Sequence, residues 1–171
     1  PPADVALTTY ALTAIGTVEL LGVPNLTLSG TLAARVNTTG GTVDTDLTTP
    51  SGTVNVLFGI GEENYQAFSG TALTLIIADF ISIVGDFTFD KTVDATGTKI
   101  RVAAANVNAS MQTPDGLLAV RVIAAEFGLV LFSTTDASAT YALVARGGAE
   151  LIGIPGLNIS GALAVQINAT G

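Results

Sequence analysis

The chain has no cysteine, no histidine and no tryptophan among its 171 residues. Without cysteine, neither disulfides nor thiolate metal sites can stabilise the fold. Without histidine, Ser-His-Asp and Cys-His nucleophile systems are excluded, since both depend on an imidazole base. Stability therefore has to come from side-chain packing and backbone hydrogen bonds.

Charged residues make up only 12% of the chain, with six Lys and Arg against fourteen Asp and Glu. The basic residues are scattered, so they form no patch that could neutralise a phosphate backbone, and we predict no nucleic-acid binding. Apolar residues make up 49%, which is too many for a disordered chain. They are interrupted every few positions, and no run reaches the roughly 20 residues of a transmembrane helix. We therefore expect no transmembrane segment.

Apolar and polar residues alternate along most of the chain, which is the period of a β-strand. Many runs begin at a Gly, often followed by Thr, and such a Gly permits a turn or a bulge. No segment combines helical spacing with capping signals. The fold class that we predict is all-β. In this fold we expect one set of alternate residues to be buried (Leu28, Val36, Phe87, Phe89, Leu163 and Ile167) and their neighbours to face solvent (Thr27, Arg35, Thr88 and Gln166).

The chain contains an internal repeat. Residues 10–40 and residues 141–171 are identical at 17 of 31 positions, and most of the differences conserve size and character. The chain therefore divides into roughly one repeat unit, residues 1–140, with a period of about 131 residues, and the start of a second copy, residues 141–171. A weaker similarity sets residues 78–92 on residues 23–37 and places Gly85 against Gly30.

Many short strands with a long repeat favour a linear array, and we expect an elongated β-solenoid-like tandem-repeat array. The alternative is a string of β-sandwich domains, which would also repeat at this length. A linear array has open ends, so we expect association end to end with further repeats of the same chain or with other copies. At the carboxyl end we expect the neighbour to resemble residues 42–58, because these follow Gly40 in the first copy.

The segments LLGVPNLTLSGTLAARVNTTG and LIGIPGLNISGALAVQINATG carry a resemblance, as does FSGTALTLIIADFISIVGDFTF at residues 68–89. They resemble tandem repeats of giant bacterial cell-surface proteins. The resemblance implies an extracellular or cell-surface location and a very long parent protein, and it transfers no catalytic or binding residue. The low Cys and Lys content with abundant Thr and acidic residues fits the same class. The chain begins at Pro1 without a signal-peptide pattern, so we expect any targeting signal to lie outside it.

Acidic residues are the remaining candidates for chemistry. The nearest carboxylate pairs for glycoside hydrolysis are Glu62 with Glu63 and Asp86 with Asp90. Adjacent residues on a strand point to opposite faces, and Asp86 and Asp90 share a face that we expect to be solvated, so we expect no enzyme. Calcium is the candidate ion, because seven acidic residues near turns offer hard oxygen ligands: Asp44, Asp46, Glu62, Glu63, Asp86, Asp90 and Asp94. No EF-hand loop or calcium-binding nonapeptide occurs, so we assign no metal ligand and expect no cofactor.

Five Asn-x-Ser/Thr sequons would allow surface glycans, at Asn25, Asn37, Asn108, Asn158 and Asn168. The sequence thus predicts a structural or adhesive segment of an extracellular filament, matrix or giant surface protein. A calcium- or carbohydrate-binding module within such a protein is the alternative. The latter would need a cluster of exposed aromatic residues, and the chain has only three Tyr and no Trp.

Overall fold

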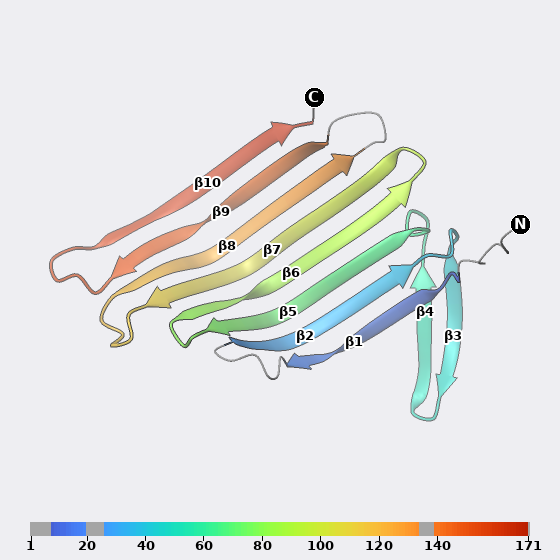
Figure 1. Ribbon diagram of the computed structural model, residues 1–171, viewed down its shortest axis with the longest axis horizontal. Coiled ribbons are helices and arrows are strands. Elements are labelled where there is room, and N and C mark those ends of the chain that lie inside the picture. The colour runs from blue at the N-terminus through green and yellow to red at the C-terminus, as the bar shows by residue number, and fades with distance from the viewer. Residues whose placement is uncertain (1–7, 20–25, 134–138, 171) are drawn as a thin grey trace, which may run out of the picture.

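The computed structural model describes residues 8–19, 26–133 and 139–170, which form ten strands and no helix (Figure 1). The all-β prediction is therefore confirmed. Across these residues no helix long and apolar enough to cross a membrane is found. Eight strands form one antiparallel sheet in the order β1 (Ala11–Glu19), β2 (Leu26–Asn37), β5 (Tyr65–Ile77), β6 (Ile81–Asp94), β7 (Gly97–Gln112), β8 (Ala119–Ser133), β9 (Thr140–Ile152) and β10 (Ile159–Ala169).

The remaining two strands, β3 (Val43–Thr49) and β4 (Gly52–Phe58), form a separate hairpin that stands at one end of the sheet (Figure 1). The hairpin is inserted between β2 and β5 in the sequence, yet β2 pairs directly with β5 in the sheet. In the first copy, residues 42–58 therefore do not lie beside β2, and the neighbour expected at the carboxyl end stays a prediction. The strand that lies beside β2 comes from residues further along the chain.

The large sheet is open, and among the described strands no solenoid coil and no second facing sheet is identified. Period-two alternation identifies a strand and its faces, but it does not identify the strand's neighbours. The neighbours are set here by the connections. Short turns, such as residues 95–96 between β6 and β7, join successive long strands and favour antiparallel pairing over the crossover to a next coil.

A line of bulges crosses the sheet from β2 to β9. One extra residue in β5, β7 and β8 interrupts the pairing with the neighbouring strands. At these points Ala72, Asn106 and Ala124 have positive φ values of 50°, 55° and 47°. Bulges increase the local twist and bend a sheet, so this line marks where all the central strands bend together.

Glycines make room for the bulges. Gly30 in β2 lies opposite Ala72 and Leu73 of β5, and a Cβ atom there would lie 2.8 Å from Leu73 Cδ2 and 3.0 Å from Ala72 O. Gly85 in β6 accommodates the β7 bulge in the same manner, with Val107 Cγ2 at 3.0 Å. The weak sequence similarity that aligns Gly85 with Gly30 thus aligns two glycines that each leave space for a bulge in the neighbouring strand.

The two similar segments form hairpins of the same register. In the first, Ala11 pairs with Asn37 and Glu19 with Ser29 along β1 and β2. In the second, the corresponding residues of β9 and β10 pair in the same way, with Ala142 opposite Asn168. The first hairpin lies at one edge of the sheet and the second at the other, so β1 and β10 are its two edge strands.

The buried core is small. The buried apolar residues are Val56, Phe58, Ala67, Ala104 and Ala119. The six residues expected to be buried share one face of the sheet, and Thr27, Arg35, Thr88 and Gln166 share the other, so the predicted phase is right. The predicted burial is wrong, because none of the six is fully buried and Leu163 is 68% exposed. Only a second layer on that face would bury them.

Candidate functional site

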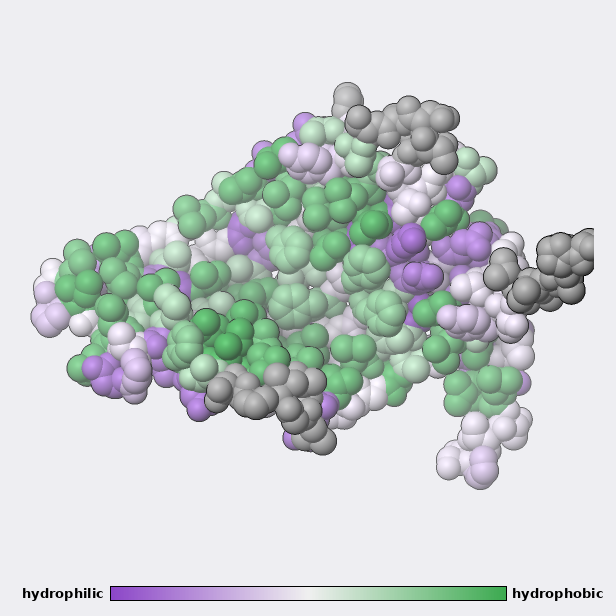
Figure 2. Space-filling model, in the orientation of Figure 1, coloured by the Kyte–Doolittle hydropathy of each residue, from purple (hydrophilic) through white to green (hydrophobic). Residues whose placement is uncertain are grey.

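One face of the sheet, called here the apolar face, carries almost only hydrophobic side chains. The strand registers place there Leu28 and Leu32 of β2, Leu75 and Phe68 of β5, Ile83, Phe87 and Phe89 of β6, Val102 and Val107 of β7, Val122, Phe127 and Leu129 of β8, Leu143 and Leu151 of β9, and Leu163, Val165 and Ile167 of β10. Figure 2 shows hydrophobic side chains spread over much of the sheet, with polar ones gathered toward the strand ends near the hairpin. Gln66 and Lys91 lie in that polar region of the face.

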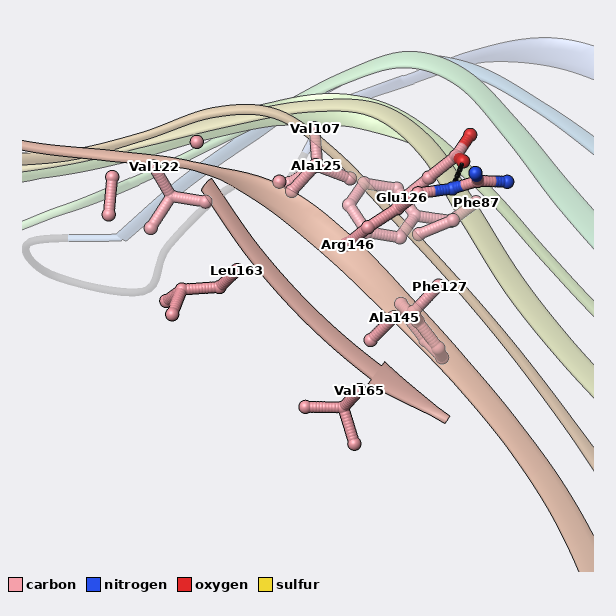
Figure 3. A pocket seen from close by; sticks show the side chains of 14 residues that line it. Phe87, Val107, Val122, Ala125, Glu126, Phe127, Ala145, Arg146, Leu163 and Val165 are labelled. Atoms are coloured by element: carbon pink, nitrogen blue, oxygen red, sulfur yellow. Dashed lines mark hydrogen bonds and ion pairs between the residues drawn. The ribbon is translucent and has the colours of Figure 1, made fainter. Parts of the chain in front are cut away.

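The apolar face is hollowed over strands β6 to β10. The hollow has a volume of about 290 Å³ and a lining that is mostly aliphatic and aromatic. Figure 3 shows Leu163 and Val165 projecting from β10, with Phe87 and Phe127 on the strands beyond. Among the described residues that line it, the only ionisable groups are Glu126 and Arg146, which form an ion pair with each other. Such a surface can bind apolar groups, but it presents no acid, base or nucleophile free for catalysis.

The exposed area of the molecule is large for its mass. The accessible surface is 11532 Å² for 17.2 kDa. A compact monomer of this mass would expose about 7,800 Å², so the chain as a whole exposes roughly 3,700 Å² more. A stable interface between two proteins needs only about 800 Å² from each partner. The excess area is therefore larger than an interface of this kind needs.

Arg35 is the centre of a polar cluster on the opposite face. Its guanidinium donates two hydrogen bonds to the Glu62 carboxylate, at 2.6 and 3.0 Å, and a third to the backbone oxygen of Leu57 at 2.8 Å. The same group lies 4.7 Å from the ring centroid of Phe58 and 5.4 Å from that of Tyr65. Phe58 is the most buried apolar side chain. The cluster thereby fastens the β3–β4 hairpin to the sheet.

The hydrogen bonds in this cluster change the acidity of its members. The Arg35 guanidinium lowers the pKa of Glu62 from its ordinary value of 4.5, and the amide of Gly59, which donates to Glu62 Oε2 at 2.9 Å, acts in the same direction. Burial raises the pKa of Tyr65. Glu62 is therefore held as a paired carboxylate, which makes it a structural anchor and not a general acid.

Asp86 and Asp90 share a face, as predicted, but each has a structural partner. Asp86 accepts hydrogen bonds from the amide of Ala72 at 2.9 Å and from the side chain of Asn106 at 2.8 Å, and these bonds lower its pKa. It therefore holds the two bulges on either side of β6. Asp90 is buried and accepts a 2.7 Å bond from Arg101. The structure does not bring the two together as a catalytic pair.

The other acidic candidates also lie apart. Asp44 and Asp46 on β3 both accept from the side chain of Asn55, at 3.0 and 2.9 Å. Asp94 accepts from the backbone and hydroxyl of Thr96 in the turn after β6, which lowers its pKa. Within residues 8–19, 26–133 and 139–170, no group of three or more Asp and Glu side chains is arranged to hold a metal ion. These acidic residues therefore stabilise the hairpin, a turn, the bulges and an ion pair.

The sequons fall in unequal environments. Asn37 is fully buried, and its side-chain amide donates to the backbone oxygens of Gly41 and Glu62 at 2.9 and 2.8 Å, so it offers no group to a glycan in this fold. Asn158 and Asn168 are exposed, and Asn25 lies outside the described residues. Asn108 accepts a bond from the amide of Ala124, so it supports the β8 bulge.

The two edge strands are long, and among the described strands each pairs with one neighbour only, although β1 also contacts strand β4 of the hairpin. Neither β1 nor β10 contains a Lys or Pro, and β10 has no charged residue at all. Edge strands of monomeric proteins are commonly blocked by such residues, because free backbone groups pair readily with another strand.

Within the part of the chain that the structure describes, these observations show a sheet with one uncovered apolar face, two edge strands with one neighbour each, and a polar face whose charged groups largely pair with one another. Comparison of the chain with family models, with curated proteins and with solved structures found no match.

Proposed function

We propose that this chain is a structural segment of an extracellular filament, matrix or surface protein. In this proposal, its sheet packs against other sheets and extends by pairing with further strands. The observation that carries the proposal is the uncovered apolar face. A face of this size costs free energy when it is left in water, and it is typical of proteins that bury it in an assembly.

The partner that fits the apolar face best is another sheet of the same kind. Sheets pack face to face when both faces are apolar and follow the same twist. The roughly 3,700 Å² that the chain exposes beyond a compact monomer exceeds what a stable pair needs from one partner. An elongated array would then grow strand by strand within a sheet, with sheets layered on one another, and not by the coils of a solenoid.

The cell-surface location and the tandem array are proposals supported by the internal similarity of residues 10–40 and 141–171, by the Thr-rich acidic composition and by the resemblance of these segments to surface repeats. A calcium- or carbohydrate-binding role is less well supported. The acidic residues are engaged elsewhere. Phe68 lies opposite Phe89 on the apolar face, with Phe87 two residues along β6, but the chain has no tryptophan to add to this group.

The proposal is tested by sedimentation velocity over a range of concentrations. The unaltered chain is expected to associate at micromolar concentration. A variant with Val122→Lys and Leu163→Lys on the apolar face is expected to remain monomeric, because burying two ammonium groups would cost several kcal/mol. The control, Thr88→Lys with Gln166→Lys, adds the same charge to the opposite face and should associate as before. A soluble monomer of the unaltered chain at high micromolar concentration, without filaments by electron microscopy, would refute the proposal.

A further inference from the structure

We infer that the two free edges of the sheet are strand-addition sites with different specificities. The β10 edge accepts a strand like β5, and the β1 edge accepts a strand like β8. The inference rests on the proposed sheet-building function and names the partner at each edge.

The comparison of β10 with β2 identifies the first partner. The two strands occupy the same register in their hairpins, but β2 has a further neighbour, β5, and β10 has none. At the β5 bulge, the side chain of Leu73 packs over Gly30 of β2. A Cβ atom at Gly30 would lie only 2.8 Å from Leu73 Cδ2, so no larger residue fits there. Gly161 is the counterpart of Gly30 in the second copy, and it has no atom within 4 Å of a Cβ position. At Gly161, β10 therefore has an empty space of the kind that the β5 bulge fills at Gly30.

The comparison of β1 with β9 identifies the second partner in the same way. β9 pairs on its outer side with β8, whose bulge brings Ala125 against Gly147. A Cβ atom at Gly147 would lie 2.8 Å from Ala125 Cβ and 3.0 Å from Ala125 Cα. Gly16 is the counterpart of Gly147 in the first copy, and it has nothing within 4 Å. At Gly16, β1 therefore has an empty space of the kind that the β8 bulge fills at Gly147.

Side chains at the strand ends are consistent with this assignment. Asn37 at the end of β2 and Asn168 at the end of β10 both accept hydrogen bonds from the threonine two residues later. The end of β10 therefore has the same local turn as the end of β2.

Charge does not decide the partner at β1. Glu19 of β1 is the counterpart of Glu150, which lies opposite Arg121 of β8 without forming an ion pair with it. The ion pair between β8 and β9 joins Glu126 to Arg146, and the counterpart of Arg146 in β1 is Ile15. The β1 edge therefore keeps one position of opposite charge and lacks the ion pair. The β10 and β5 strands carry no charge, so no such mismatch arises at their edge.

Two synthetic peptides test the inference on the full chain. One spans β5, residues 65–77, and the other spans β8, residues 119–133, each with two lysines added at both ends for solubility. Fluorescence anisotropy measures binding, and amide hydrogen exchange shows which strand is protected. The β5 peptide is expected to protect β10, and the β8 peptide to protect β1. Scrambled peptides of the same composition are expected to protect neither.

Two glycine variants supply the matched control. Gly161→Val is expected to weaken binding of the β5 peptide by about tenfold or more, because the new side chain occupies the space for the bulge, and to leave the β8 peptide unaffected. Gly16→Val is expected to do the reverse. Neither substitution meets an atom within 4 Å in the unbound chain, so both variants should fold.

The inference is overturned if neither edge is protected, or if both variants weaken both peptides equally. These outcomes are separate from the test of the proposed function. A chain that stays monomeric but shows the reciprocal pattern would refute the sheet-building function and keep the edge specificities. A chain that associates but binds both peptides without discrimination would do the opposite.

Discussion

Replacing Gly30 with valine is expected to destabilise the sheet by more than about 3 kcal/mol. Gly30 has a φ of +143°, which L-amino acids rarely adopt, and its Cβ would lie 3.0 Å from the backbone oxygen of Ala72 and from Leu73 Cα. These atoms belong to the β5 bulge and cannot move without breaking its pairing with β2. Urea unfolding at low micromolar concentration measures the loss.

Gly161→Val is the matched control for this prediction, because it changes the same position in the second hairpin. Its φ is not positive and its surroundings are empty, so stability should be unchanged or slightly raised by the higher β-propensity of valine. Equal destabilisation by the two substitutions would show that Gly30 is required by its own strand and not by the bulge opposite it.

Replacing Arg35 with methionine is expected to cost about 2–3 kcal/mol at pH 7. The substitution keeps the apolar stem over Phe58 but removes the two bonds to Glu62 and the bond to the Leu57 oxygen. The hairpin should loosen before the sheet does, which hydrogen exchange of β4 amides would detect. Arg121→Met is the control, because Arg121 is exposed and makes no ion pair with another described residue.

The cost of Arg35→Met should depend on pH. The folded-state pKa of Glu62 is depressed, so the stability that the pair contributes is present above the ordinary value of 4.5 and is lost as the pH falls through the folded pKa. The difference between variant and unaltered chain should therefore shrink at acidic pH. A difference that stays constant from pH 7 to pH 3 would assign the effect to packing alone.

The faces of the strands could be predicted from the sequence because alternation is a local property. Phe87 and Phe89 share a face, as do Thr88 and Gln166 on the other side. Glycines at matching positions of the two copies, such as Gly30 and Gly161, were also informative, since a glycine within an alternating run indicates close approach of another strand. These features depend on neighbouring residues and on geometry that every strand shares.

What covers each face could not be predicted, because it depends on contacts between distant segments. Leu163 has the pattern of a core residue but lies on an uncovered surface. Arg35 was expected to face solvent and instead anchors the hairpin through Glu62, 27 residues away. The bulge residues Ala72 and Ala124 adopt positive φ values that alanine rarely adopts, so their identity does not indicate them, whereas asparagine, as at Asn106, adopts such values more often.

Small-angle X-ray scattering of the unaltered chain, extrapolated to zero concentration, tests most directly whether the molecule is a single open layer. A sheet of eight strands, about 50 Å by 38 Å and 10 Å thick, has a radius of gyration of about 18 Å and the scattering of a thin slab. That is the result expected here. A radius near 15.5 Å, which is about the value for a compact globular chain of 171 residues, would show that the apolar face is folded inward and would contradict the account.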